Sequence, residues 1–232
     1  MTLPDDPAFL EAKAKIKAIF FDLDGTLIDT DDAVLDRLAS KLERFSGLLP
    51  GRDPRRLLRR AMLVAEGPVN RAVTLLDLLG LDDNVFALGD RLRRIKGLRV
   101  QGQFIAVEGA VETLRGLHDN YRLGIITTRS RRDAAAFLGQ FGLEELFQVV
   151  AAREDTWRLK PHPEPIHYAV DFLGLSPTQC AMVGDTAVDI AAAKAAGSYA
   201  VGVLCGFGEL EDLAKAGADL ILGQTAQLEE WF

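Results

Sequence analysis

The sequence predicts an α/β fold in which helices cover both faces of a parallel sheet and an all-helical domain is inserted after the first strand. Short apolar runs, rich in β-branched and aromatic residues, alternate with helical patterns along most of the chain. These runs are apolar almost throughout and do not alternate with polar residues, as expected for strands that are buried on both faces. With 232 residues, 48% of them hydrophobic, the chain can bury a core, and a disordered protein is excluded.

Six strands are expected, and helical patterns lie between them. Parallel strands need a crossover connection, which is usually a helix. The connection after the second strand is the clearest: Ser130 is the expected N-cap, and Gly142 ends an apolar stripe that should lie on the sheet. The predicted strands span residues 17–22, 121–127, 147–152, 180–185, 199–204 and 218–222.

The stretch between the first two strands is too long to be a simple connection. Residues 29–105 show helical periodicity and no strand pattern. Structureless loops of such length are uncommon inside compact domains, so this stretch is predicted to form a helical domain of its own. The α/β core would then comprise residues 1–28 and 106–232.

Charge and hydropathy narrow the possible partners and location. The net charge of −7, from 27 basic and 34 acidic residues, disfavours nucleic acid as the main partner. No apolar run approaches the roughly 18 residues of a membrane helix, and the acidic N-terminus does not resemble a signal peptide. We therefore expect a cytoplasmic protein with no membrane partner. Cys180 and Cys205 lie among apolar residues and are expected to be buried thiols.

The strongest chemical signal follows the first strand, where an apolar run leads directly into Asp22, Asp24 and Gly25. Open α/β sheets bind ligands at the carboxyl ends of their strands, so Asp22 should face a crevice. Gly25 lets the backbone turn sharply with its N–H groups toward an anion. The spacing does not fit an EF-hand calcium loop. A polar turn at a strand end is the ordinary alternative.

A second acidic pair follows the fourth predicted strand. Asp185 leaves this strand, and Asp189 lies one turn into the next helix, so both carboxylates can reach the same crevice. Taken alone, the pair also suits helix capping. Together with Asp22 and Asp24, however, it would gather four carboxylates that repel one another unless a cation neutralises them. Ligands that are all oxygen atoms favour Mg²⁺.

Two further strand ends supply a hydroxyl group and a positive charge. Thr127 closes the second strand, where its hydroxyl and the N–H of Thr128 can bind a phosphoryl oxygen. Lys160 precedes Pro161, which biases the lysine toward an extended backbone that reaches into the site. Ordinary strand propensity would explain the threonine alone, and solvent exposure the lysine alone. Beside the acidic pairs, both become candidates for phosphate binding.

The order of these motifs resembles the haloacid dehalogenase-like (HAD) hydrolase superfamily. The insertion is similar to the helical cap of its phosphoglycolate phosphatase and β-phosphoglucomutase branch. This resemblance implies a Rossmann-like core with a cap domain over residues 29–105. Thr128-Arg129 stands where an Asn-Lys pair is usual in that branch. The four motifs are matched in order by Asp22-x-Asp24-Gly25-Thr26, Thr127, Lys160-Pro161, and Gly184-Asp185 with Asp189.

The resemblance implies a phosphatase mechanism. Asp22 would be the nucleophile that forms an aspartyl phosphate, and Asp24 the general acid and then the general base. Thr127 and Lys160 would be catalytic through neutralising charge on the phosphoryl oxygens. The implied phosphate-binding residues are Leu23, Asp24, Thr127, Thr128 and Lys160. The implied Mg²⁺ ligands are Asp22, Asp24 through its backbone carbonyl, Asp185 and Asp189.

The implied substrate is a small phosphorylated metabolite, and the protein is expected to be a monomer or a homodimer. A carboxylate at Asp24 favours an oxygen leaving group over carbon–halogen chemistry.

A sugar-phosphate mutase of the β-phosphoglucomutase type is the alternative enzyme. A non-catalytic phosphoacceptor or scaffold is the alternative from another class, although in a response-regulator receiver the acidic pair precedes the lysine, whereas here Lys160 precedes it. Arginines of the insertion, such as Arg52 and Arg71, are candidates to read a second anionic group.

Overall fold

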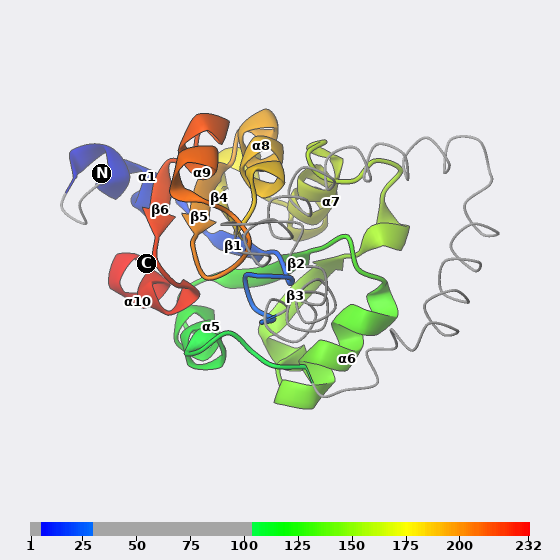
Figure 1. Cartoon of the computed structure of the whole chain (residues 1–232). Coiled ribbons are helices and arrows are strands. Elements are labelled where there is room, and N and C mark those ends of the chain that lie inside the picture. Colours follow the sequence, from blue (N-terminus) through cyan, green and yellow to red (C-terminus); the bar gives the residue numbers. More distant parts are fainter. Residues whose placement is uncertain (1–5, 30–103) are drawn as a thin grey trace, which may run out of the picture.

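The computed structural model describes residues 6–29 and 104–232, which form one parallel six-stranded sheet with helices on both faces (Figure 1). The strand order is β3-β2-β1-β4-β5-β6. The predicted fold class is therefore confirmed for the core. All six predicted strands are present, with ends within two residues of the expected ones. They are β1 (Ala18–Phe21), β2 (Arg122–Ile126), β3 (Phe147–Ala151), β4 (Cys180–Gly184), β5 (Tyr199–Val203) and β6 (Leu220–Leu222).

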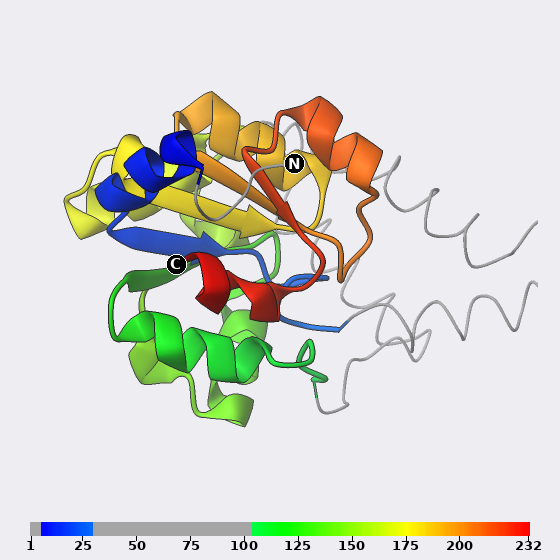
Figure 2. The ribbon, with the colours of Figure 1, turned by 90° about the vertical axis from the view of Figure 1, so that its left-hand side faces the viewer.

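Two sets of helices bury the two faces of the sheet, and Figure 2 shows them on opposite sides. One face packs against α5 (Ala110–His118), α6 (Arg131–Phe141) and α10 (Leu228–Trp231), and Phe9 of α1 (Pro7–Lys15) belongs to the same hydrophobic cluster. The other packs against α7 (Glu164–Leu173), α8 (Ala187–Ala196) and α9 (Leu210–Ala216). Because both faces are covered, the strand side chains are apolar apart from the exposed Arg122 in β2 and Gln148 in β3. Short 3₁₀ turns span Glu144–Leu146, Arg153–Asp155, Pro177–Gln179 and Thr225–Gln227.

Local sequence signals explain where α6 begins and ends. The Ser130 side chain accepts a hydrogen bond from the backbone N–H of Asp133, as expected of an N-cap residue. Gly142 adopts the left-handed conformation at the C-terminus, with a φ of 61°. Ala134, Phe137 and Leu138 are buried between these ends. The predicted apolar stripe of this helix is thus confirmed.

The position of β1 determines where a ligand can bind. This strand pairs with β2 on one side and with β4 on the other, so the strand order reverses beside it. Phe21, its last residue, is in register with Ile125 and Val183. The carboxyl ends of the three strands therefore lie at one edge, which is the usual binding crevice of an open α/β sheet.

The chain leaves this edge and returns to it at adjacent positions. The backbone N–H of Asp29 donates to the carbonyl of Ile105 at 2.8 Å, and Ile28 forms an antiparallel bridge with Ala106. The predicted insertion of residues 29–105 falls between these points. Apart from its ends, it lies outside the described residues, as do Arg52 and Arg71. The division into core and cap stays a prediction.

Two further expectations can be compared with the structure. None of the helices within residues 6–29 and 104–232 has both the length and the apolar character that membrane crossing requires. Cys180 is buried as expected, but the expectation for Cys205 was wrong because this thiol is only partly buried. It lies beyond the end of β5, and its Sγ is 3.3 Å from the carbonyl oxygen of Gly25.

Candidate active site

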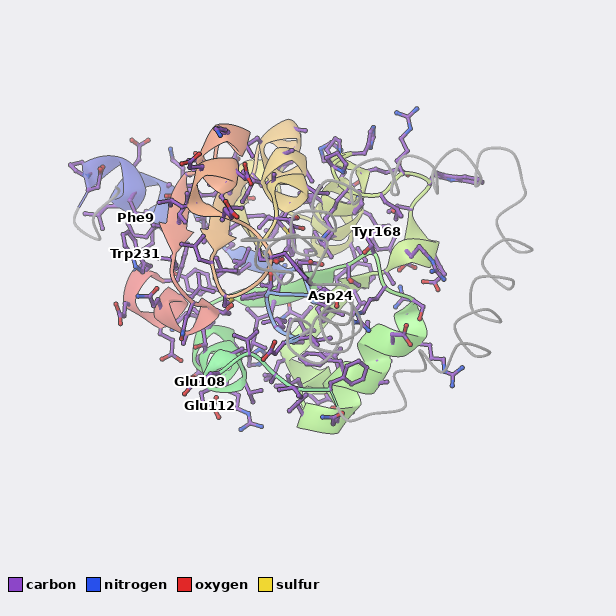
Figure 3. All side chains as sticks on the ribbon, viewed as in Figure 1. Phe9, Asp24, Glu108, Glu112, Tyr168 and Trp231 are labelled. Carbon is purple, nitrogen blue, oxygen red and sulfur yellow. The ribbon has the colours of Figure 1, made fainter. Side chains whose placement is uncertain are left out.

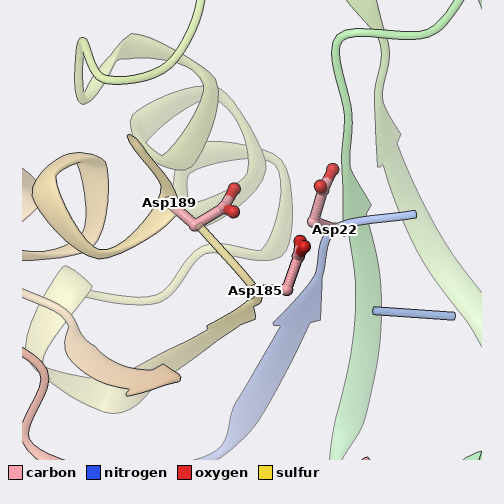
Figure 4. Close-up of side chains that lie close together, drawn as sticks. All are labelled: Asp22, Asp185 and Asp189. Atoms are coloured by element: carbon pink, nitrogen blue, oxygen red, sulfur yellow. The ribbon is translucent and has the colours of Figure 1, made fainter. Parts of the chain in front are cut away.

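Three carboxylates meet at the carboxyl ends of β1 and β4 (Figure 4). Asp22 directly follows β1, Asp185 directly follows β4, and Asp189 lies in the first turn of α8. Each offers a carboxylate oxygen, and these three oxygens lie within 4.8 Å of one another. The exposed fractions are only 8%, 0% and 1%. Such close and buried carboxylates repel one another strongly unless positive charge compensates them.

Lys160 supplies part of that positive charge. Its Nζ lies 2.8 Å from Asp22 Oδ1 and 2.5 Å from Asp189 Oδ1, and it donates a hydrogen bond to the carbonyl of Ile126 at 3.1 Å. The side chain is 3% exposed. Burial opposes the charged form, but Asp189 and Asp22 outweigh it and raise the pKa of Lys160 above its ordinary value. The lysine is therefore a fixed cation between two carboxylates.

One lysine does not fully compensate Asp22. Burial raises the pKa of the Asp22 carboxyl group to about 7, against the lowering effect of Lys160, and the charges of Asp189 and Asp24 add to the rise. The backbone holds this residue in place, since its N–H donates to the carbonyl of Val183 at 2.9 Å. An additional cation would restore the charged form of Asp22.

Asp185 is positioned by two loops. Its Oδ1 lies 3.4 Å from the Thr26 hydroxyl, and its Oδ2 accepts a hydrogen bond from the backbone N–H of Phe207 at 2.7 Å. A Cβ at Gly25 would overlap the Asp185 carboxylate, and Gly25 has a φ of 73°. A Cβ at Gly206 would overlap it too. Both turns therefore require glycine to approach the carboxylate closely.

Asp189 has a different environment. Its Oδ2 accepts hydrogen bonds from the Thr186 backbone N–H at 3.1 Å and from the Thr186 hydroxyl at 2.7 Å, while Oδ1 contacts Lys160. Both oxygens are thus engaged by the protein. This carboxylate caps α8 and anchors the lysine at the same time.

Most of the predicted phosphate-binding residues follow β1 or β2, which are neighbouring strands at this edge. Thr127 follows β2, is 4% exposed, and its hydroxyl oxygen accepts a hydrogen bond from the backbone N–H of Arg129 at 3.1 Å. Thr128 is partly buried next to it. The Leu23 side chain is buried, and its backbone N–H has no acceptor within the part of the chain that the structure describes. An unsatisfied N–H beside a candidate nucleophile is a suitable donor to a phosphoryl oxygen.

The Asp24 carboxylate belongs to a separate ion pair, with a partner that the sequence analysis did not assign. Arg129 Nε donates to Asp24 Oδ2 and Nη2 donates to Oδ1, both at 2.6 Å. The guanidinium carbon lies 5.8 Å from the centroid of the Phe104 ring. Burial lowers the pKa of Arg129, but the bond and the charge of Asp24 outweigh it and raise the pKa above its ordinary value. Figure 3 labels Asp24 among the side chains at this edge.

The Asp24 carboxylate is not one of the three that lie close enough to share an ion. Any part that Asp24 plays in binding a metal would therefore use its backbone carbonyl, as the sequence analysis expected. Two features had been missed. The contact with Arg129 was hidden because the two residues are 105 positions apart. The contact of the loop of residues 205–208 with Asp185 could not be predicted from the sequence, because Gly206 allows the close approach by having no side chain.

Replacing Gly206 with alanine tests the importance of that loop. A Cβ would overlap Asp185 and lie 2.5 Å from the Gly25 carbonyl oxygen, so the loop must shift and the bond from Phe207 to Asp185 must weaken. We expect Gly206→Ala to lower the free energy of unfolding by about 1–3 kcal/mol. Chemical unfolding monitored by circular dichroism measures this loss.

Gly139→Ala is the matched control for this substitution. A Cβ there would meet only the flexible end of Glu144, at 3.2 Å, and alanine favours the α6 helix. The control should be as stable as the parent protein or slightly more stable. Equal stability of the Gly206→Ala variant and the Gly139→Ala control would contradict the proposed crowding at Asp185.

Comparison with known proteins places this site in a family context. The family model for haloacid dehalogenase-like hydrolases matches residues 19–203. Pyrophosphatase PpaX of Halalkalibacterium halodurans is 33% identical over 184 residues, which cover 79% of this chain and 81% of that protein. Phosphoglycolate phosphatase of Chromobacterium violaceum is 31% identical over 217 residues, with 92% and 95% of the two chains covered.

A solved structure agrees with these relatives. The crystal structure of a predicted phosphoglycolate phosphatase from Haemophilus somnus 129pt has a TM-score of 0.68 to this chain at 26% identity. The match covers 93% of this chain and 97% of that chain. The family match includes the strand ends that bear Asp22, Thr127 and Asp185. The resemblance inferred from the motifs is thereby confirmed, and the chain belongs to the haloacid dehalogenase-like hydrolase family.

Proposed function

We propose that the protein is a Mg²⁺-dependent phosphatase that hydrolyses a small phosphomonoester through an aspartyl-phosphate intermediate. The observation that carries this proposal is the buried group of Asp22, Asp185 and Asp189, two of which, Asp22 and Asp189, pair with Lys160. Membership of a hydrolase family supports it, and so do relatives named pyrophosphatase and phosphoglycolate phosphatase. A cytoplasmic location and a monomeric or homodimeric state stay predictions from the sequence.

The residues present fit a divalent cation. Among the described residues, the ammonium group of Lys160 contacts two of the three buried carboxylates, and burial raises the pKa of Asp22 to about 7, so these carboxylates can accept further positive charge. Carboxylate and carbonyl oxygens are the ligands that Mg²⁺ prefers. Asp22, Asp185 and the backbone carbonyl of Asp24 would hold the ion, with Asp189 supporting it through Lys160. When bound, the ion supplies positive charge that reduces repulsion between Asp22 and the substrate phosphate.

In the first step, an oxygen of Asp22 attacks the phosphorus atom and the bond to the leaving oxygen breaks. Asp24, in its protonated form and with one oxygen released from Arg129, gives its proton to the leaving oxygen, so the leaving group departs as a neutral alcohol. Lys160, the Thr127 hydroxyl and the Leu23 backbone N–H stabilise the charge on the phosphoryl oxygens. Thr128 would add a backbone donor beside Thr127.

In the second step, water hydrolyses the aspartyl phosphate. The Asp24 carboxylate takes a proton from the attacking water, the bond between phosphorus and the Asp22 oxygen breaks, and free phosphate leaves. Asp22 returns to its carboxylate form and Asp24 regains its proton. Apart from the attacking water, the cycle needs no further reactant. The burial of Asp22 limits how much water reaches its carboxylate.

The other candidates from the sequence analysis have less support. A sugar-phosphate mutase would share the first step, but no contact among residues 6–29 and 104–232 favours it over hydrolysis. A non-catalytic scaffold has no need to bury a cation between two carboxylates, because such an arrangement costs free energy of desolvation. We therefore favour the phosphatase.

The proposal is tested with purified protein and a panel of phosphomonoesters, with p-nitrophenyl phosphate as the general substrate. We expect release of inorganic phosphate with Mg²⁺, loss of release when a chelator is added, and recovery when excess Mg²⁺ is returned. Turnover that is equally fast in chelator and in Mg²⁺ would contradict the metal dependence. Failure to hydrolyse any member of the panel would contradict the activity.

A further inference from the structure

We propose that Arg129 is a specificity-determining residue that selects leaving groups with a negative charge next to the oxygen of the broken bond. The inference rests on the proposed function because it takes Asp24 as the group that protonates the leaving oxygen. It adds a substrate class to that function. The arginine lies in the described core, outside the insertion in which Arg52 and Arg71 lie.

The geometry of Arg129 leaves part of its guanidinium available. Nε and one N–H of Nη2 donate to the two oxygens of Asp24, which is the bidentate arrangement that orients a guanidinium most firmly. Within residues 6–29 and 104–232, Nη1 donates no hydrogen bond. The side chain is 18% exposed, so solvent and ligands can reach it. One edge thus holds Asp24, and donors on the other edge remain for an anion.

The backbone around Arg129 fixes its position. Its N–H donates to the Thr127 hydroxyl oxygen at 3.1 Å, and its carbonyl accepts from the N–H of Arg153 at 3.0 Å. The guanidinium also lies over the Phe104 ring. A cation held at three places is preorganised, so it loses little conformational freedom when an anion binds.

The position of Asp24 indicates which part of the substrate meets Arg129. A group that protonates the leaving oxygen must come within hydrogen-bond distance of it, about 2.7 Å. Because Arg129 is bonded to the same carboxylate at 2.6 Å, its guanidinium lies no more than about 6 Å from the leaving oxygen. The transferred phosphoryl group would be bound by other residues, Lys160 and Thr127.

Two kinds of substrate have the required charge. In a phosphoanhydride such as pyrophosphate, the anionic oxygens are on the phosphorus next to the bridging oxygen. In a phosphoester of an α-hydroxy acid such as phosphoglycolate, a carboxylate lies beside the ester carbon. Relatives of this chain are named pyrophosphatase and phosphoglycolate phosphatase. The shared chemistry is an anionic oxygen close to the leaving oxygen, and a guanidinium binds both forms.

The experiment compares matched substrates in the full-length protein with Mg²⁺. Phosphoglycolate is paired with hydroxyethyl phosphate, in which a neutral alcohol replaces the carboxylate, and pyrophosphate is paired with methyl phosphate. The readout is the ratio of kcat/KM for the charged member to that for the neutral member. We expect the parent protein to prefer a charged member, and Arg129→Met to reduce this ratio by roughly 10- to 100-fold. The pair whose ratio falls identifies the substrate class.

Two variants make the result specific. Arg129→Lys keeps the charge without the planar fork and should retain part of the preference. Arg131→Met is the matched control, because Arg131 is 52% exposed, contacts Asp155 and lies away from Asp24; its ratio should not change. An equal loss of kcat/KM for charged and neutral substrates in Arg129→Met would overturn the inference, since Arg129 would then only position Asp24.

The failures are distinguishable. A parent protein that hydrolyses neutral and charged substrates equally well overturns the role of Arg129 and leaves the phosphatase proposal standing. A parent protein that hydrolyses none of the four substrates and none of the larger panel overturns the proposed function itself. Thermal unfolding of each variant shows whether a lost preference comes from a folded protein.

Discussion

Asp22→Asn should reduce the release of phosphate by at least about 10³-fold, the scale of loss when an enzyme's nucleophile is removed. The amide has nearly the shape of the carboxylate, but it cannot attack phosphorus and form the aspartyl phosphate. The measurement is turnover of p-nitrophenyl phosphate at saturating Mg²⁺. Turnover within about threefold of the parent rate would remove Asp22 from the role of nucleophile.

The same variant offers its own test of folding through the pH dependence of stability. Burial raises the pKa of Asp22 from 3.8 to about 7 in the folded protein, so the folded state binds this proton more tightly than the unfolded state does. The stabilisation of the folded state by the protonated Asp22 carboxyl group is therefore fully present below about pH 4 and is lost as the pH rises to about 7. In chelator, the parent protein should therefore lose stability relative to Asp22→Asn over this range.

Thermal unfolding at about pH 5 and about pH 8 measures that difference. Because asparagine does not titrate in this range, the stability of the variant relative to the parent protein should be greater at about pH 8 than at about pH 5. A folded variant with this pH profile and no turnover would assign the lost activity to chemistry. A constant difference between the two proteins would contradict the raised pKa of Asp22.

Lys160→Met should cause the largest loss of stability among the single substitutions considered. It removes the cation from between Asp22 and Asp189 and leaves both carboxylates buried without compensation. Removing one partner of a buried ion pair typically costs about 3–5 kcal/mol. The measurement is the free energy of unfolding in urea, in the presence of chelator. Phosphate release should also be lost, because the proposed role of Lys160 is to stabilise the phosphoryl oxygens.

Lys194→Met is the matched control for that loss. Lys194 Nζ forms a comparable pair with Asp219 Oδ1 at 2.7 Å, but its side chain is 43% exposed. An exposed pair contributes about 0–1 kcal/mol. Addition of Asp189→Asn to Lys160→Met removes one of the uncompensated charges and should recover part of the stability. Equal losses of unfolding free energy in Lys160→Met and Lys194→Met would show that burial of the Lys160 ion pair does not increase its contribution to stability.

Much of the core could be predicted because its signals are local. Each strand is a short apolar run, and Ser130 and Gly142 mark the two ends of a helix within the residues that surround them. The acidic pairs were recognisable for a related reason, since each directly follows a strand. Parallel strands then bring their carboxyl ends to one edge, so Asp22 and Asp185 could be expected to meet.

The remaining parts of the site depend on contacts that no local pattern records. Arg129 reaches Asp24 because β1 and β2 are neighbours, and the sequence analysis noted this arginine only as a departure from the usual Asn-Lys pair and assigned it no partner. Gly206 matters because it has no side chain, and Cys205 is only partly buried because it packs against the margin of the core, beside Gly25. The cap prediction concerns residues outside the described ranges.

The hydrogen bond between Asp29 and Ile105 has a consequence for how this family can diversify. Because the polypeptide exits and re-enters through neighbouring positions, the segment between them can lengthen, shorten or be exchanged without changing strand order or register. The carboxylates of Asp22, Asp185 and Asp189 belong to the part that stays constant. Selection can therefore act on the sequence between these two positions almost independently of the carboxylate group.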